Sequence, residues 1–93
     1  MSEYRVFETE EFLRSLGRLP EAEGSFVRAK LSRLAYPQLR EMPFFGPNVR
    51  KLRGYSPETW RYRVGNYRVF FHVDDTEKIV FVLSVDKRKD AYR

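Results

Sequence analysis

The spacing of hydrophobic residues near the start of the chain predicts a short strand followed by a helix. Residues 4–7 are rich in β-forming side chains, which favours a strand. Thr9 is expected to cap a helix whose first turn carries Glu10 and Glu11, because carboxylates are stabilised at the positive end of a helix. Gly17 is the expected end of this helix. The expected buried stripe of the helix consists of Phe12, Leu13 and Leu16.

A second helix is predicted from Pro20, because proline is favoured in a first helical turn. Its expected buried stripe consists of Val27, Leu31, Leu34 and Ala35. Pro37 is expected to end it, and the two helices should then form a hairpin. Residues 37–48 contain three prolines and a glycine, which predicts a connecting loop.

Beyond residue 48 the pattern becomes typical of β-strands. The expected strands are 49–53, 60–64, 67–73 and 78–85, joined by a loop at 54–58, a two-residue turn at Gly65-Asn66 and a polar turn at 74–77. The last strand is apolar on both faces, which favours a position in the middle of the sheet. The sequence therefore predicts one domain over residues 1–93 with an α+β fold: an N-terminal strand and a helical hairpin packed on a mostly antiparallel sheet of four to five strands.

The Gly65-Asn66 turn predicts a cluster of cations on one face of the sheet. A two-residue hairpin turn fixes the register, so Arg63 should lie opposite Arg68 and Arg61 opposite Phe70. Directly opposed residues share a face, which gathers the three arginines on one side. The other side should carry the apolar residues Trp60, Tyr62, Val64, Tyr67, Val69 and Phe71.

Two arginines directly across a strand pair repel each other by a few tenths of a kcal/mol up to about 1 kcal/mol. A bound phosphate would offset this repulsion, because a guanidinium presents a rigid fork of donors. The alternative is that the arginines extend into water and pair with Glu58, Asp74 or Asp75. The hairpin by itself leaves both interpretations open.

The charge of the chain is uneven. The net charge is +5: residues 1–47 hold seven Lys and Arg against seven Asp and Glu, whereas residues 48–93 hold eleven against six. A basic surface on one side favours a polyanionic partner.

Other classes of site have little support in the composition. There is no cysteine and one histidine, His72, so we expect neither a disulfide framework nor a metal site, and no cofactor. His72 should share the face of Arg68 as a packing or surface residue, and Asp74 and Asp75 should serve a turn. No apolar run of membrane-spanning length and no signal-peptide pattern occurs, so we expect a cytoplasmic protein with no membrane association.

Three ordered motifs resemble the RelE toxins of the RelE/ParE toxin–antitoxin superfamily. Residues 51–54, Lys-Leu-Arg-Gly, resemble the K-L-x-G turn of that family, and residues 63–68 resemble its R-x-G-x-Y-R hairpin. Residues 85–92 resemble its last strand followed by R-x-x-x-Y. The resemblance implies a ribosome-dependent endoribonuclease that cuts messenger RNA by metal-free attack of a 2′-hydroxyl. It also implies that a cognate antitoxin holds the enzyme inactive.

The resemblance carries over a set of catalytic residues, which are Arg61, Arg63, Arg68, Arg88 and Tyr92. It implies that Arg68 and Arg88 clamp the scissile phosphate and that Tyr92 acts as general base. Prototype members have lysines in place of Arg61 and Arg63, and an arginine gives up a proton far less readily. The basic residues expected to add contacts to RNA phosphates are Lys51, Arg53, Lys87 and Lys89.

Two other functions are compatible with the same fold. The ParE branch of the superfamily inhibits DNA gyrase by protein contact and needs no nuclease residues. A non-catalytic member would hold nucleic acid through its arginines without cutting it.

Overall fold

A computed structural model describes residues 3–87 as a five-stranded mixed sheet with helices. The elements follow the chain as β1 (Arg5–Glu8), α1 (Glu10–Gly17), α2 (Glu21–Lys30), the π-helical turn η1 (Leu31–Ala35), α3 (Tyr36–Glu41), β2 (Val49–Lys51), β3 (Trp60–Val64), β4 (Tyr67–Asp74) and β5 (Ile79–Lys87). The strand order is β1-β5-β4-β3-β2, and only β1 and β5 are parallel. The predicted α+β class and five-stranded sheet are confirmed.

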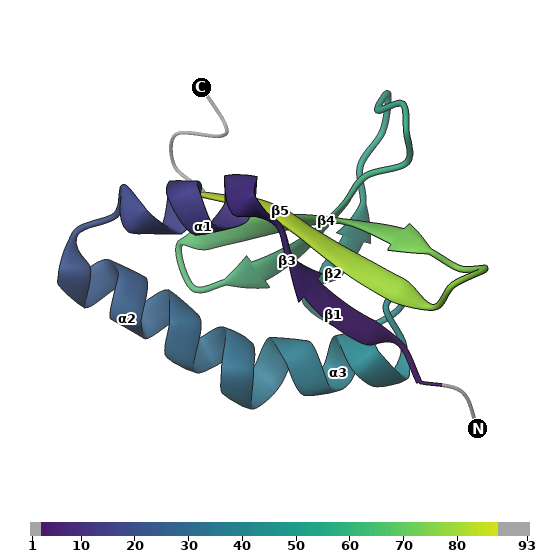
Figure 1. Cartoon of the computed structure of the whole chain (residues 1–93), viewed down its shortest axis with the longest axis horizontal. Helices are drawn as coiled ribbons and strands as arrows, with labels where there is room; N and C mark the ends of the chain where they lie inside the picture. Colours follow the sequence, from purple (N-terminus) through teal and green to yellow (C-terminus); the bar gives the residue numbers. More distant parts are fainter. Residues whose placement is uncertain (1–2, 88–93) are drawn as a thin grey trace.

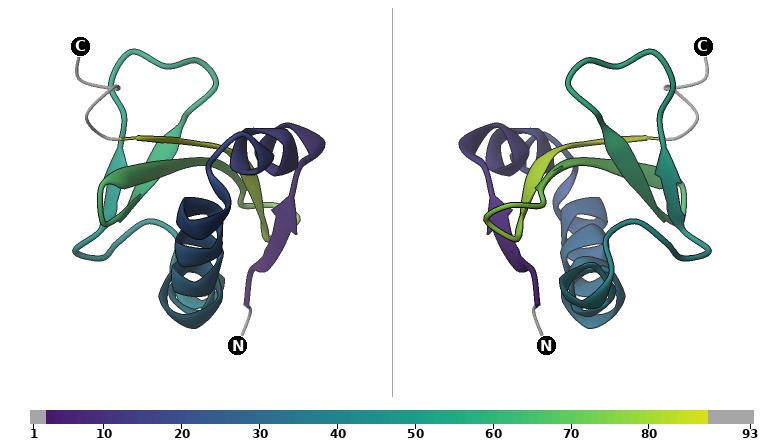
Figure 2. Two further views of the ribbon diagram at one scale, coloured as in Figure 1. Left: turned by 90° about the vertical axis from the view of Figure 1, so that its left-hand side faces the viewer. Right: turned by 90° about the vertical axis from the view of Figure 1, so that its right-hand side faces the viewer.

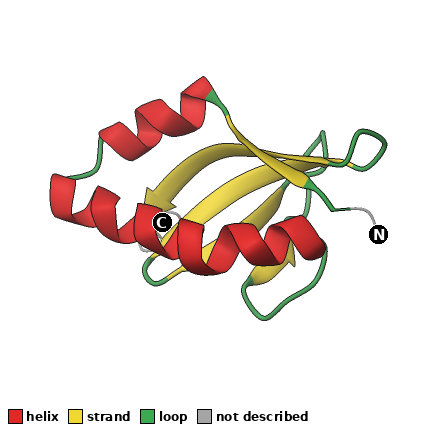
Figure 3. Cartoon of the chain, turned by 60° about the horizontal axis from the view of Figure 1, so that its bottom comes forward, coloured by secondary structure: helices red, strands yellow, loops and turns green. Residues whose placement is uncertain are grey.

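One group of helices covers a face of the sheet, and the remaining helix lies at an edge (Figures 1 and 3). The segment α2-η1-α3 forms one long helical rod across one face, while α1 lies alongside β5 at the edge of the sheet. Seen end-on, the rod lies on one side of the sheet and the β2–β3 loop, residues 52–59, rises on the other (Figure 2). Within residues 3–87 no helix covers this second side, which we call the open face.

The core lies between the rod and the sheet. Its fully buried side chains include Phe12 of α1, Leu31 and Leu39 of the rod, and Phe71 and Val80 of the sheet. On β4 the buried positions alternate from Tyr67 to Phe71, so one side of this strand faces the core, while on β3 Arg61 is buried in addition to its neighbour Tyr62. Apolar burial at about 25 cal/mol per Å² is the main stabilising contribution at these positions.

The helical rod continues through Pro37, contrary to the prediction that this residue ends a helix. Proline normally clashes with the carbonyl four residues earlier. Here the preceding turn is π-helical, and the amide N–H of Tyr36 donates to the carbonyl of Leu31, five residues back. This wider turn accommodates the ring, so α3 occupies the first part of the expected 37–48 loop.

Two residues assigned to the buried stripes are exposed instead. The side chain of Leu13 is 46% exposed and that of Leu34 is 56% exposed. The π-helical turn shifts the phase of the stripe, so Leu31 and Ala35 are buried while Leu34 points outward. In α1 the N-cap is as predicted, because the Thr9 hydroxyl accepts from the amide of Phe12.

The predicted register of the β3–β4 hairpin is confirmed, with Arg63 opposite Arg68 and Val64 opposite Tyr67. Between β4 and β5 the register shifts, since Phe70 pairs with Ser84 whereas Phe71 pairs with Val82. This is a β-bulge, which leaves an extra residue on β5 and inverts the alternation beyond it. No helix in the described part of the chain is long and apolar enough to span a membrane.

Candidate nucleic-acid interface

Four arginines share the open face of the sheet. Arg63 and Arg68 oppose each other across β3 and β4, and Arg61 opposes Phe70 on the same side. On the neighbouring strand, Arg50 opposes Arg61. Directly opposed residues point to one side of a sheet, so the three predicted arginines gather there with a fourth. We call Arg50, Arg61, Arg63 and Arg68 the arginine face.

Arg61 and Arg63 differ in exposure and therefore in what they can do. Arg61 is only 6% exposed, and its guanidinium donates to the backbone carbonyl of Asn48 at 2.9 Å. The amide of Arg63 donates to the same carbonyl, also at 2.9 Å. Arg61 thus holds β3 against the chain entering β2, whereas the exposed side chain of Arg63 is available to a ligand.

Arg68 is half-buried and is the member of the arginine face that lies on β4. Its guanidinium lies over the ring of Phe70, 5.3 Å from the ring centroid, in a cation–π contact. Asp86 lies directly opposite Arg68 on β5, so one carboxylate moderates the repulsion between Arg63 and Arg68. The face remains predominantly cationic.

The carboxylates proposed as alternative partners of the arginines are engaged elsewhere. Glu58 pairs with Lys51 at 2.8 Å, and Asp75 pairs with Lys78 at 3.1 Å. Asp74 accepts from the backbone amides of the turn that follows it, as expected for a turn residue. None of these three contacts involves an arginine of the open face.

The structure separates two predicted phosphate-binding lysines from the arginine face. Lys51 opposes Trp60, so its side chain belongs to the helix side of the sheet. Lys87 opposes Tyr67 and pairs with Glu23 of α2 at 3.4 Å. The β-bulge explains the position of Lys87, because without it the alternation from Phe81 would have turned residue 87 to the open face.

Of the remaining predicted residues, only Arg53 belongs to the part of the chain that the structure describes. Arg53 is part of the 52–59 loop, which rises on the open side of the sheet (Figure 2). Arg88, Lys89 and Tyr92 lie outside the described residues.

A tyrosine–carboxylate pair fixes the end of the hairpin against α2. The hydroxyl of Tyr67 donates a hydrogen bond to Glu23. Burial and this hydrogen bond raise the pKa of Tyr67 to about 12. The same hydrogen bond lowers the pKa of Glu23. The nearby positive charge of Lys87 lowers it as well. The hairpin that carries Arg63 and Arg68 is therefore anchored at its turn.

His72 lies on the open face beside the arginines, as predicted, and its Nε2 atom is 3.1 Å from the hydroxyl of the buried Thr59. This contact fits a packing role. Among residues 3–87 no group of three or more His, Asp or Glu side chains is placed to hold a metal ion.

The same chain matches a family model over most of its length. The model describes the ParE toxin of the type II toxin–antitoxin system parDE, and it matches residues 9–92. The chain belongs to this family. It is thus a toxin of the RelE/ParE superfamily, which confirms the resemblance carried by its motifs.

The toxin is similar in structure to several solved RelE proteins. It is similar to a chain of the RelBE2 toxin–antitoxin complex of Mycobacterium tuberculosis, with a TM-score of 0.71 and 28% identity over 95% of this chain and 94% of the other. The toxin is also similar to the isolated RelE toxin of E. coli, with a TM-score of 0.63 and 28% identity over 90% of this chain and 83% of the other. A chain of the archaeal RelE–RelB complex of Pyrococcus horikoshii matches with a TM-score of 0.61 and 28% identity over 91% of this chain and 94% of the other. No match was found among proteins of curated function.

Sequence reasoning missed Arg50 as a member of the arginine face of this toxin. The signal was present, because Arg50 and Lys51 are adjacent and can only point to opposite sides of a strand. Choosing between them required the pairing of β2 with β3, which places Arg50 opposite Arg61. The 52–59 loop between these strands is too long to fix their pairing register, so the sequence alone does not predict it.

Proposed function

We propose that this toxin is a ribosome-dependent endoribonuclease that cuts messenger RNA and is held inactive by a cognate antitoxin. The observation that supports it is the arginine face, where Arg63 and Arg68 oppose each other on the side of the sheet that no helix of residues 3–87 covers. Two guanidinium groups in this arrangement suit a phosphate, which each can grip through two donors. The antitoxin is proposed because the similar structures include toxin–antitoxin complexes.

The proposed reaction is an in-line displacement at phosphorus. The 2′-oxygen of the RNA attacks the phosphorus, the bond to the 5′-oxygen breaks, and the products are a cyclic 2′,3′-phosphate and a 5′-hydroxyl. Negative charge builds up on the non-bridging oxygens, where fixed cations stabilise the transition state more than the ground state. Guanidinium groups supply this stabilisation, so the proposal requires no metal ion.

The structure suggests separate roles for the arginines. Arg63 and Arg68 are proposed to hold the scissile phosphate, while the buried Arg61 positions β3 through Asn48. Arg88 and Tyr92 keep the roles that the family resemblance implies: a second clamp and the base that takes the 2′-hydroxyl proton. An arginine is a poor proton donor, so we assign protonation of the 5′-oxygen to water.

The decisive experiment is a map of transcript 5′ ends after brief induction of the toxin. We expect new 5′ ends within translated regions, and we expect them to disappear when translation initiation is blocked. Arg63→Ala and Arg68→Ala should each lower cleavage by about 100- to 1000-fold, the usual effect of removing one charge-stabilising donor. Tyr92→Phe should also abolish it.

Arg33→Ala is the matched control, because Arg33 is an exposed arginine of η1 in the helical rod, on the other side of the sheet. It should cut RNA like the unchanged toxin. Cleavage that survives both arginine substitutions would contradict the proposal.

Gyrase inhibition is the second candidate, because the family model that matches this chain describes ParE toxins. A DNA supercoiling assay with purified gyrase tests it directly. Inhibition of supercoiling that persists in Arg63→Ala and Arg68→Ala, with no new transcript ends, would favour this function over the nuclease.

A further inference from the structure

An aromatic row crosses the open face next to the arginine face. Phe7 of β1 is in register with Phe81 of β5, and Phe81 is in register with His72 of β4. The Phe7 and Phe81 rings meet edge to face, with centroids 5.9 Å apart and an interplanar angle of 74°. Because neighbouring strands lie about 4.8 Å apart, this register places the three side chains in one strip across three adjacent strands.

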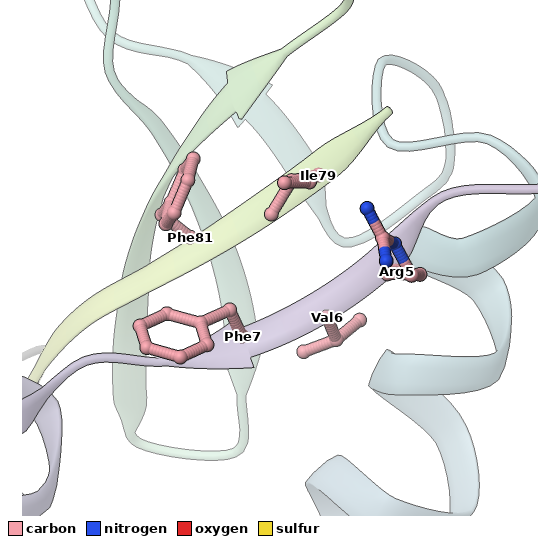
Figure 4. Close-up of a pocket in the computed structure, with 5 residues that line it drawn as sticks. All are labelled: Arg5, Val6, Phe7, Ile79 and Phe81. Carbon is pink, nitrogen blue, oxygen red and sulfur yellow. The ribbon is translucent and has the colours of Figure 1, made fainter. Parts of the chain in front are cut away.

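The strip borders a hollow on the protein surface (Figure 4). The hollow has a volume of about 290 Å³ and is lined by Arg5, Val6, Phe7, Ile79 and Phe81. Phe7 is 55% exposed, so its ring is accessible to a ligand. Arg5 is an exposed cation at one end of the hollow.

The combination of exposed rings and cations indicates the kind of ligand that fits. A nucleobase offers a flat π-face to an aromatic ring, and the phosphates on either side of it are attracted to nearby guanidinium groups. An apolar protein segment would match the rings but would leave the cation of Arg5 at the edge of its contact without a counter-charge. The arginine face on the same side of the sheet extends the positive charge along the path of a polynucleotide.

We propose that Phe7 and Phe81 form a stacking site for an unpaired base of single-stranded RNA, with Arg5 binding its phosphate. This inference rests on the proposed nuclease function and adds a base-binding site to it. Phe81 is in register with His72, which is four residues from Arg68 on β4, about 13 Å along the strand at about 3.3 Å per residue. That distance exceeds one stacked step of about 3.4 Å, so the bound base belongs to a nucleotide near the scissile one.

The test uses the whole toxin and an RNA that it cannot cut. The probe is a short single-stranded 2′-O-methyl RNA with the fluorescent base 2-aminopurine at one position, moved along the strand from one oligonucleotide to the next. Stacking on a ring is expected to quench the fluorescence at one position. An abasic site at that position should weaken binding by about 5- to 100-fold, the usual contribution of one stacked base.

Two substitutions separate stacking from apolar contact. Phe7→Leu and Phe81→Leu keep an apolar side chain but remove the ring, so each should abolish the quenching and the difference between intact and abasic RNA. Phe7→Trp should retain both. Phe45→Leu is the matched control, because Phe45 is 71% exposed but belongs to the loop before β2 and not to the open face.

Three results would overturn the inference. The first is quenching that survives both leucine substitutions, and the second is no quenching by the unchanged toxin at any position. The third is an apolar docking site, which would appear as loss of antitoxin binding in Phe7→Ala with RNA binding intact. The nuclease proposal is judged separately, because the transcript map does not depend on the stacking probe.

Discussion

At the scale of single residues, arginines that look equivalent in the sequence differ in burial and therefore in their roles. Arg61 and Arg63 are two positions apart on β3 and share its open side. Only Arg61 is buried, with its guanidinium bound to the carbonyl of Asn48. A charged donor in such a place contributes mainly to stability, while an exposed one remains available for a ligand.

This difference predicts unequal effects on folding. Arg61→Ala is expected to lower the free energy of unfolding by about 2 kcal/mol, because a buried charge-assisted hydrogen bond is lost. Arg63→Ala should change it by less than about 0.5 kcal/mol, as is usual for an exposed side chain. Urea denaturation followed by circular dichroism measures both. Equal losses of stability would contradict the assignment.

The Tyr67–Glu23 pair predicts how stability depends on alkaline pH. The pKa of Tyr67 is raised to about 12 in the folded protein, above the value of about 10 expected in the unfolded chain. The stabilising effect of this shift is therefore complete below pH 10 and is lost as the pH rises toward 12. Tyr67→Phe should be less stable than the unchanged toxin at pH 8, and the difference should shrink through this window.

Urea unfolding at a series of pH values tests this expectation. Tyr55→Phe is the control, since Tyr55 is 56% exposed in the β2–β3 loop. A Tyr67→Phe difference that stays constant from pH 8 to 12 would disprove the coupling.

At the scale of elements, the edge of β5 is closed by two successive partners. β1 pairs with its first half, and α1 lies along its second half. Ser15 of α1 makes the connection there, because its hydroxyl accepts from the amide of Val85 and donates to the carbonyl of Phe12. A helix side chain thus replaces the hydrogen bond that a further strand would provide.

Ser15→Ala is expected to lower the free energy of unfolding by about 1–3 kcal/mol, because the buried amide of Val85 loses its acceptor. Ser25→Ala, at an exposed position of α2, is the matched control and should have an effect below about 0.5 kcal/mol. Hydrogen exchange at the Val85 amide gives a local measurement, with faster exchange expected in Ser15→Ala only. Unchanged protection of this amide would show that the serine hydroxyl is not its acceptor.

At the scale of the whole molecule, the sheet sorts its cations onto two sides. The arginine face lies on the open side, while Lys51 and Lys87 lie on the helix side in ion pairs with Glu58 and Glu23. Net charge alone does not distinguish these groups. In the proposed RNA complex, only cations on the side that meets RNA release counterions.

The salt dependence of RNA binding should reveal this sorting. For single-stranded RNA the slope of log affinity against log salt is about −0.7 for each phosphate that is neutralised. Arg63→Ala should therefore reduce the slope by about 0.7, whereas Arg33→Ala and Lys87→Ala should leave it unchanged. Fluorescence anisotropy with the uncuttable RNA measures the slope. A reduced slope in Arg33→Ala or Lys87→Ala would place RNA on the helix side.

The sequence by itself determined the features that depend on near neighbours in the chain. The two-residue turn at Gly65-Asn66 fixed the hairpin register, because so short a connection allows few pairings, and the arginine cluster followed from it. Thr9 marked the start of α1 for a similarly local reason. The change from helical to strand periodicity near residue 48 gave the α+β class.

The tertiary structure decided whatever depended on distant partners. The helix passes Pro37 because a π-helical turn, packed on the sheet, widens the backbone in front of it. Lys87 turned to the helix side because pairing with β4 introduces a bulge, and Arg50 entered the arginine face through its pairing with β3. These outcomes follow from contacts between segments far apart in the chain, and a local pattern contains no information about such contacts.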